Sequence, residues 1–474
     1  MNKRILLIIG CWIGVIGIGF SQNTQATIYT LQDCLDISIE NNLVLKIQEL
    51  RAKASKTNFK ESKNNILPSL NMNYNLGINN GRSIDPFTNS YINQELTFSN
   101  AGLSLDATIF NGFRIKNEIK QSRFNMQAFE MEIEEAKQNL TLEVTLLYIQ
   151  ILNNRDLLEL SKARLTTTES QLKRFESQYN NGLGNPADFT DMQGQYAREQ
   201  TGIITAENNL KSAVLNLVKL LSIDVDSENR FETIFEIINT EKYQISADDI
   251  YNDALENLAT FKSKQLLIDA AKTGIKIARS NYFPEVSLFG QLNTNYSSIA
   301  QLFIQTGTST IETGDFVAIN GQDQAVLRNE TQFESSKINY KDQFDNNLYS
   351  VVGISVRVPL FNGFRAKNNV RIKKIQHEEA QVNLKQTKFI FKQSIKEAYN
   401  NMESSFKRYH ALKNQVTAYE ESFRVNEVRL NNGVSNMLEY ITSKNNMETS
   451  KLTLNQTKYE YLLRIKILDY YRGL

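Results

Sequence analysis

The pentapeptide FNGFR occurs twice, at 110–114 and again at 361–365, 251 residues later. Its surroundings repeat without a gap, because GLSLDATIFNGFRIKN from Gly102 aligns with GISVRVPLFNGFRAKN from Gly353. Both copies read as an alternating strand, a glycine turn and a long segment of charged and apolar residues. The sequence therefore predicts one duplicated unit, where a chain of 474 residues would ordinarily suggest two or three independent domains.

The duplication extends upstream with a different spacing. SKNNILPSLNM at 62–72 aligns with ARSNYFPEVSL at 278–288, an offset of 216 residues that grows to 251 by Gly102. About 35 extra residues therefore lie between 296 and 348, in a stretch rich in Thr, Gly, Asn, Gln and Ser. Lengthening a surface loop costs little closure entropy, so we expect 297–347 to be an exposed loop that has tolerated an insertion.

Four segments alternate apolar and polar residues with the period of a strand: 68–78, 96–110, 284–296 and 348–361. In the first, Leu70, Met72, Tyr74 and Leu76 alternate with serine and asparagine. Their length is close to the roughly 9 to 11 residues with which a tilted strand crosses a bilayer. The pattern alone also fits a soluble sandwich with one wet face.

Two long stretches, 116–179 and 367–430, contain neither proline nor glycine. Each predicts a single helix of roughly 60 residues, about 90 Å long. A seven-residue apolar stripe runs along both and is typical of coiled-coil packing. Its members are Val144, Ile151, Leu158, Leu165, Leu172 and Tyr179, then Ile395, Met402, Tyr409, Val416, Phe423 and Leu430. The companion positions of the first helix are less uniform and include Asn154, Ser161 and Thr168.

Both long helices end at an Asn-Asn-Gly turn, at 180–182 and 431–433, and a second helix is expected to start near Pro186 and Met437. We therefore divide the chain into a first repeat, 27–223, and a second repeat, 248–474, joined by an inter-repeat segment, 224–247. Each repeat contains helices, two strands and a long helical hairpin, at 114–223 and 365–474.

The N-terminus has the three parts of a secretory signal peptide, which we assign to 1–26. Lys3 and Arg4 precede an uncharged apolar run at 5–20, and small and polar residues follow. Cleavage removes Cys11 and leaves Cys34 as the one cysteine, so no disulfide can form within the exported chain. We expect Cys34 to be a small buried residue at a helix start.

The composition argues against two other classes of function. The chain has 53 basic and 52 acidic residues, so no long-range field favours nucleic acid. It has two histidines, His377 and His410, both in the second long helix, and no phosphate loop, metal-ligand cluster or nucleophile elbow. We expect no catalytic residues, no metal site and no cofactor.

Four strands per chain cannot close a barrel, since the smallest membrane barrels use about eight, so we expect an oligomer. The paired FNGFR motifs, the paired Asn-Asn-Gly turns, and ISIENNLVLK at 37–46 with DALENLATFK at 253–262 make the chain resemble the TolC family of outer-membrane efflux and secretion channels. The resemblance covers essentially the whole mature chain.

That resemblance implies an α+β membrane protein that works as a homotrimer. Its four strands per chain would contribute to a trimeric 12-stranded β-barrel in the outer membrane of a Gram-negative bacterium. A long α-helical coiled-coil barrel would continue it through the periplasm, with an equatorial region near 224–247. The chain would be the passive exit duct of a tripartite efflux pump or a type I secretion system, which the sequence does not distinguish. A periplasmic membrane-fusion adaptor and an inner-membrane pump of the RND or ABC type would be its partners, besides outer-membrane lipid.

The resemblance also places functional residues. Gly182, Leu183, Gly433 and Val434 would be the turns at which the adaptor docks. Asp188, Asp191, Glu439 and Thr442 would lie near the periplasmic constriction or gate. Carboxylates of three chains crowded into one ring repel one another and attract cations, so such a ring can filter.

Other interpretations of these residues remain open. Asp188 could cap a first turn and Glu439 could lie on a solvated face. At the second tip relatives carry a basic residue where this chain has Ser435, and Lys444 is a further charged neighbour.

The FNGFR motif itself predicts structure. Gly112 and Gly363 would bend the backbone where a strand becomes a helix, and Phe110, Phe361 and their neighbouring phenylalanines would pack the joint. The rival for the whole chain is a periplasmic coiled-coil scaffold or adaptor without a channel, which explains the helices but not the four strands.

Overall fold

The computed structural model describes residues 28–85, 88–223, 230–232 and 241–474. The expected signal peptide and most of the inter-repeat segment 224–247 lie outside these residues. Within them, no helix is both long enough and apolar enough to cross a membrane. The chain forms two compact units. One, here the sheet unit, comprises Glu49–Glu132 and Ala259–Lys388; the other, here the helical unit, comprises Met1–Gln48, Ile133–Leu258 and Phe389–Leu474.

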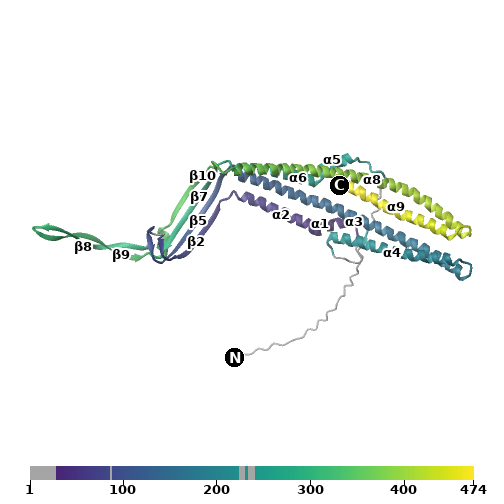
Figure 1. The fold of residues 1–474 in the computed structure, drawn as a ribbon, viewed down its shortest axis with the longest axis horizontal. Helices are drawn as coiled ribbons and strands as arrows, with labels where there is room; N and C mark the ends of the chain where they lie inside the picture. Colours follow the sequence, from purple (N-terminus) through teal and green to yellow (C-terminus); the bar gives the residue numbers. More distant parts are fainter. Residues whose placement is uncertain (1–27, 86–87, 224–229, 233–240) are drawn as a thin grey trace, which may run out of the picture. The chain divides into compact units, whose positions relative to one another are not determined.

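The sheet unit is built on a four-stranded antiparallel sheet in the order β10-β7-β5-β2 (Figure 1). The strands are β2 (Ser69–Asn79), β5 (Leu96–Asn111), β7 (Glu285–Ser297) and β10 (Tyr349–Arg357). The first repeat supplies β2 and β5 and the second supplies β7 and β10, so the central β5–β7 pairing joins the two copies. Among the strands described, β2 and β10 each have a neighbour on one side only.

The helices that precede the sheet strands repeat with the offset of 216 read from the sequence. Helix α1 (Leu31–Asn41) corresponds to α5 (Ala247–Asn257), and α2 (Leu43–Asn64) corresponds to α6 (Ala259–Ser280). Both short helices begin at a hydroxyl N-cap: Thr30 accepts from Asp33 N, and Ser246 accepts from Asp249 N. The duplication therefore includes the hydrogen bonds that cap the N-termini of these helices.

Two expectations from the sequence are wrong in the second repeat. The strand expected over 348–361 ends at Arg357, because Pro359 has no backbone N–H to donate to a neighbouring strand. The expected loop 297–347 is instead a β-hairpin, β8 (Gln301–Ile319) and β9 (Gln322–Lys337), followed by α7 (Tyr340–Asn346). Strand β8 is rich in threonine, and its pairing with β9 shifts register twice, which interrupts the alternation by which the other strands were found. In the first repeat the corresponding place has only β3 (Arg82–Ile84) and β4 (Tyr91–Asn93).

The FNGFR motif forms the bend that the sequence predicts, and the left-handed conformation extends over two residues instead of the glycine alone. Gly112 and Gly363 have φ of 66° and 62°, and the phenylalanine after each is also left-handed, at 62° for Phe113 and 60° for Phe364. In each copy the two phenylalanine rings meet edge to face, 5.3 Å apart at Phe110 and 5.6 Å at Phe361. They pack on one another, but Phe113, Phe361 and Phe364 stay more than half exposed, so they do not form a buried joint.

The long helices follow the stretches that lack proline and glycine. Helices α3 (Arg114–Asn180) and α8 (Arg365–Asn431) have 67 residues each, and the return helices α4 (Pro186–Leu221) and α9 (Met437–Arg472) have 36 each. Several members of the seven-residue stripe are buried: Val144, Ile151, Leu158, Ile395, Met402 and Val416. The stripe is thus the seam along which the helices of the helical unit pack.

The core of the helical unit surrounds Tyr148 on α3. Its hydroxyl lies 3.0 Å from the carbonyl of Tyr29 and 2.8 Å from that of Glu232. Tyr29 belongs to β1 (Ile28–Tyr29) and Glu232 follows β6 (Arg230–Phe231), and these two strands pair in parallel. Strand β6 lies in the inter-repeat segment 224–247. Cys34 is fully buried in the same cluster, as expected, and burial raises the pKa of its thiol to about 12, so it stays protonated.

The two junction glycines differ in their surroundings and allow a matched test. A Cβ at Gly112 would meet Phe283 Cβ at 2.7 Å and Ser280 O at 2.8 Å, whereas a Cβ at Gly363 would meet nothing within 4 Å. Both alanine substitutions force a side chain into the left-handed region, at a cost of roughly 1–2 kcal/mol. We expect Gly112→Ala to lower the thermal midpoint, followed by circular dichroism, distinctly more than Gly363→Ala. Equal losses would mean that backbone conformation alone sets the cost.

Candidate functional site

The two turns at the tips of the helical hairpins have the same geometry. After α3, Gly182 N donates to Tyr179 O at 3.0 Å and Leu183 N to Gln178 O at 2.9 Å; after α8, Gly433 N and Val434 N make the equivalent bonds. This is a Schellman motif, closed by glycines with φ of 73° and 71°. Such motifs often bury the residue after the glycine, but Leu183 is 85% and Val434 68% exposed. The tips therefore present an apolar side chain to solvent.

The expected gate acids occupy matching positions on the return helices. Asn185 caps α4 by accepting from Ala187 N, and Asn436 caps α9 by accepting from Glu439 N. Asp188 and Glu439 are each the third residue of the helix, where the positive end of the helix dipole stabilises a carboxylate. The structure therefore gives Asp188 the first-turn position of the alternative interpretation. Glu439 also lies in a first turn, and its side chain is half-exposed.

Glu439 has partners from its own tip. Ser435 Oγ donates to Glu439 Oε2 at 2.6 Å, and Arg429 Nη1 lies 3.6 Å from the same oxygen. Arg429 thus supplies a basic group at the second tip, where the resemblance had drawn attention to Ser435. Asp191 and Thr442 lie one turn further along the return helices and are exposed.

A small apolar cluster holds the two tips together. Its buried members are Phe175, Met192, Met437 and Tyr440, with Leu172, Phe189, Phe423, Leu430 and Ile441 packed around them. Because it includes the first turns of both α4 and α9, it brings Asp188 and Glu439 to the same end of the helical unit. Leu172, Phe423 and Leu430 belong to the seven-residue stripe, so the seam of the helices reaches the tips.

Farther from the tip turns than this apolar cluster, along α3, α4 and α9, lies a buried charged cluster that the sequence analysis missed. It consists of Arg164 and Thr168 on α3, Gln195 and Glu199 on α4, and Lys444, Asn445 and Glu448 on α9. Lys444 and Glu199 are almost completely buried, with side chains 2% exposed. Buried charges persist only when they are paired and hydrogen-bonded, so these contacts determine how the three helices pack.

Glu199 is the centre of the charged cluster. Its Oε1 accepts from Arg164 Nε at 3.1 Å and from Gln195 Nε2 at 2.8 Å, and lies 3.4 Å from Lys444 Nζ. Its other oxygen, Oε2, accepts from Thr168, whose hydroxyl in turn accepts from Lys444. Both carboxylate oxygens therefore have hydrogen-bond partners, which offsets the cost of burying them.

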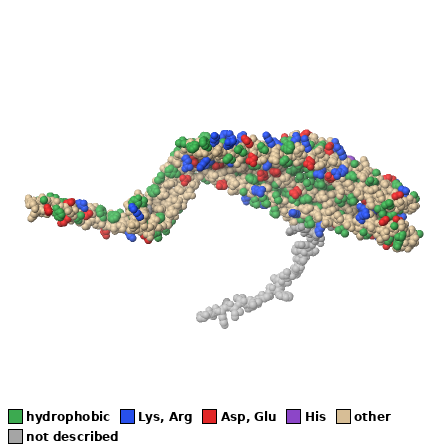
Figure 2. All heavy atoms as spheres, viewed as in Figure 1, with side chains coloured by type: hydrophobic (Ala, Val, Ile, Leu, Met, Phe, Trp, Pro, Cys, Tyr) green, Lys and Arg blue, Asp and Glu red, His purple; other side chains and the backbone are tan. Residues whose placement is uncertain are grey.

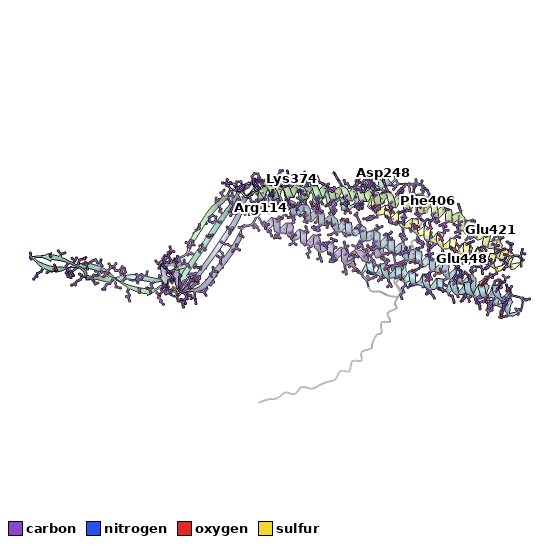
Figure 3. All side chains as sticks on the ribbon, viewed as in Figure 1. Arg114, Asp248, Lys374, Phe406, Glu421 and Glu448 are labelled. Carbon is purple, nitrogen blue, oxygen red and sulfur yellow. The ribbon has the colours of Figure 1, made fainter. Side chains whose placement is uncertain are left out.

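Glu448 has a less complete set of partners. It forms ion pairs with Arg164 and with Lys444, the latter at 3.7 Å, but its Oε2 has no hydrogen-bond partner of suitable geometry in the described part of the chain. Burial raises its pKa from the usual 4.5 to about 7, although Lys444 and Arg164 act in the opposite direction. Figure 3 labels Glu448 on α9 and the exposed Glu421 on α8.

The charged cluster does not follow the internal repeat. At an offset of 251, Arg164 and Glu199 correspond to Gln415 and Ser450, and Lys444 and Glu448 correspond to Gln193 and Ala197. None of these equivalents is charged, so the cluster occurs once per chain and joins the first hairpin to α9. One signal could have revealed it: Thr168 occupies the companion seam of α3, where a polar residue needs a partner across the interface.

Removing the ammonium of Lys444 leaves Glu199 and Glu448 buried with less compensating charge. Breaking a buried pair on one side costs about 3 kcal/mol or more. We expect Lys444→Met to lower the thermal midpoint of the helical signal strongly. The matched control is Lys451→Met, two turns further along α9, whose partner Glu420 is half exposed and whose loss costs less than about 1 kcal/mol. Similar midpoints for the two variants would contradict the role given to the cluster.

The raised pKa of Glu448 predicts that the stability of the helical unit depends on pH between the unfolded and the folded pKa of this carboxyl. Because the pKa in the folded state, about 7, is above the unfolded value of 4.5, the folded chain binds the extra proton in this range. Its stabilising contribution is complete below pH 4.5 and is lost as the pH rises through 7. We expect the thermal midpoint of wild type to fall from pH 5 to pH 8, and that of Glu448→Gln to change less.

The control for this prediction is Glu421→Gln. Its hydrogen bond with Arg424 lowers the pKa of the Glu421 carboxyl, so its own titration lies below the tested range. We expect this variant to keep the wild-type decline. An equal slope in Glu448→Gln and wild type would show that another group titrates.

Comparison with known proteins shows which family has this architecture. The family model described as outer membrane efflux protein matches residues 34–222 and 250–468. The chain is similar to the outer membrane protein TolC of Salmonella enteritidis, with 21% identity, an alignment that covers 100% of this chain and 86% of that protein. It is also similar to toxin and drug export protein A of Aggregatibacter actinomycetemcomitans, with 21% identity over 77% of this chain and 71% of that protein.

Solved structures share the fold. CusC superimposes with a TM-score of 0.75 at 16% identity, covering 94% of this chain and 92% of that one. The CmeC outer membrane channel of Campylobacter jejuni superimposes with a TM-score of 0.72 at 15% identity, covering 94% and 85%. The two matched segments of the family model include both long helical hairpins and the sheet, and this chain belongs to the outer membrane efflux protein family.

Proposed function

We propose that the chain is the outer-membrane exit duct of an efflux pump or a type I secretion system, and that it works as a homotrimer. The observation that carries the proposal is the sheet β10-β7-β5-β2, whose two outer strands lack a second neighbour among the strands described. Open edges of this length invite pairing with another chain. Three copies, pairing β10 of one with β2 of the next, would close a barrel of twelve strands in outer-membrane lipid.

The long helices fit the same assembly. At 67 residues, α3 and α8 each measure about 100 Å. Three chains would contribute twelve helices, counting α4 and α9, to a coiled-coil tube in the periplasm. The buried stripe members on α3 and α8 supply its packing seams within each chain. Such a conduit is passive, and selection of the cargo would fall to the pump at its base.

The tips are the proposed docking surface for a periplasmic membrane-fusion adaptor, which would link the duct to an RND or ABC pump. Leu183 and Val434 are exposed on turns fixed by their Schellman bonds. A small apolar side chain on a rigid turn can enter a pocket on a partner without an ordering cost. Gly182 and Gly433 would be required for the turns rather than for contact.

Asp188 and Glu439 are the proposed inner acids of the constriction, with Asp191 and Thr442 one turn away. Three copies would bring six carboxylates to the end of the tube, and their combined charge would attract cations. Since Arg429 and Ser435 already hold Glu439, we assign the larger share of this field to Asp188. A periplasmic scaffold without a channel is the alternative, and membership of the efflux family favours the duct.

Conductance in planar bilayers tests the proposal. We expect purified wild type to form trimeric, cation-selective channels, and Asp188→Asn/Glu439→Gln to conduct with lower cation selectivity. Glu421→Gln removes an acid from an exposed site on α8 and should match wild type. A protein that inserts no channels, and stays in solution without detergent after removal of the signal, would refute the duct and leave the scaffold. Channels of unchanged selectivity would refute only the acid ring.

A further inference from the structure

The β8–β9 hairpin of the second repeat is far longer than the β3–β4 pair at the corresponding place in the first. Its strands have 19 and 16 residues, so β8 alone is roughly 60 Å long. The two strands pair only with each other among the strands described. A two-stranded ribbon in water is marginally stable at best, so a ribbon of this length needs something to cover it.

The neck of the hairpin is a built structure. Gln343 of α7 is fully buried and joins the end of β7 to the end of the hairpin. Its Nε2 donates to Ser297 O at 3.0 Å and to Ile338 O at 2.9 Å, and its Oε1 accepts from Ser297 N at 2.9 Å. One side chain therefore closes the neck and satisfies three backbone groups.

Aromatic contacts fix the neck to the four-stranded sheet. Tyr340 packs on Tyr296 of β7 and on Phe344, with ring centroids 4.8 and 4.4 Å apart. Its hydroxyl lies 3.1 Å from Ser99 Oγ on β5 and 3.3 Å from Tyr74 Oη on β2. These contacts hold the base of the hairpin in place on the sheet.

The two faces of the hairpin differ in chemistry. Following the strand register, Phe303, Phe316, Leu327 and Phe333 share one face, here the aromatic face. Each is between 59% and 64% exposed, and Figure 2 shows hydrophobic side chains open to solvent along the hairpin. Glu312, Asp323 and Lys337 also lie on this face. The opposite face is aliphatic instead of aromatic, and it carries Leu302, Ile304, Val317 and Ile319 together with Arg328, Glu330 and Glu334.

One segment of the aromatic face, next to the neck-end pair Gln301–Lys337, carries no charge. From Phe303 to Thr310 on β8, and from Asn329 to Ser335 on β9, the side chains on this face are Phe, Gln, Thr, Asn and Ser. Identical charges brought together around a symmetry axis repel, whereas an uncharged aromatic strip can pack against its own copies. Over the same segment the opposite face carries Glu330 and Glu334, which would repel their own copies around such an axis.

We propose that the aromatic face is a second interface between copies of this chain, in which three hairpins pack together beyond the barrel. The proposal rests on the trimer of the proposed function. In that trimer each hairpin leaves the loop between β7 and β10, and β10 is a subunit edge, so three necks fixed to three sheets would stand around one axis. The interface is thus continuous with the β10–β2 contact. It would cover the apolar strip of each ribbon and narrow the exit of the duct.

Disulfide cross-linking in isolated outer membranes tests this interface. Thr308 lies on the aromatic face and Gln332 on the opposite face, one position apart along the hairpin, and both are exposed. Cys34 is buried, so a cysteine introduced at either position is the reactive one in the mature chain. On mild oxidation we expect Thr308→Cys to give several-fold more covalently linked pairs of chains than Gln332→Cys.

A second variant shows whether the aromatic side chains hold the contact. Phe303→Ser/Phe333→Ser in the Thr308→Cys background should reduce the linked pairs several-fold. Leu302→Ser/Ile304→Ser, which alters the opposite face of the same segment, should leave them nearly unchanged.

Detergent-resistant trimers and channel conductance are measured on the same preparations. Trimers and channels with no linked pairs, or with equal linkage at both positions, would overturn the hairpin interface alone. Absence of trimers and channels would instead refute the proposed function. Linkage of Thr308→Cys to a protein of another mass would show that a different partner covers the aromatic face, which also overturns the proposal.

Discussion

The open outer edges of β2 and β10, which have no further neighbour among the strands described, are the constraint on which the proposed architecture depends. A sheet of four strands exposes a row of N–H and C=O groups on each side, and these groups cost several kcal/mol each where water is excluded. Only further strands satisfy them along their full length. The part of the chain described does not provide those strands, so the proposed trimer rests on backbone chemistry before any side chain is considered.

Internal duplication provides the geometry for such an assembly. Each repeat delivers two strands to one sheet and one long helical hairpin, and the FNGFR bend precedes the long helix with the same left-handed pair of residues in both copies. Within one chain the backbone of Ser280 lies against Gly112, whereas Gly363 follows the outer strand β10 and has no such neighbour in the described part. The two copies thus share a backbone conformation, and in the proposed trimer the next chain would be the neighbour of the second bend.

The sequence predicts the parts of this fold that rest on local patterns. The long helices were predictable because α3 and α8 lack glycine and proline, and the sheet strands because Leu70 and its neighbours alternate regularly. The β8–β9 hairpin was missed because its threonines and register shifts hide the alternation. The charged cluster was missed because its members look like surface residues: nothing in the sequence near Lys444 indicates that α3 and α4 supply Thr168 and Glu199 to it.

The position of the charged cluster has a consequence for assembly. In the proposed trimer, packing contacts of helices within a chain alternate with related contacts between chains, and the repeat makes the two kinds similar. Buried charges occur at the contact within the chain, where Arg164, Glu199 and Lys444 meet, and their equivalents Gln415, Ser450 and Gln193 are neutral. A folding chain can therefore pair its buried charges before it meets another copy. Placed between chains, the same charges would leave each monomer with uncompensated ions until assembly was complete.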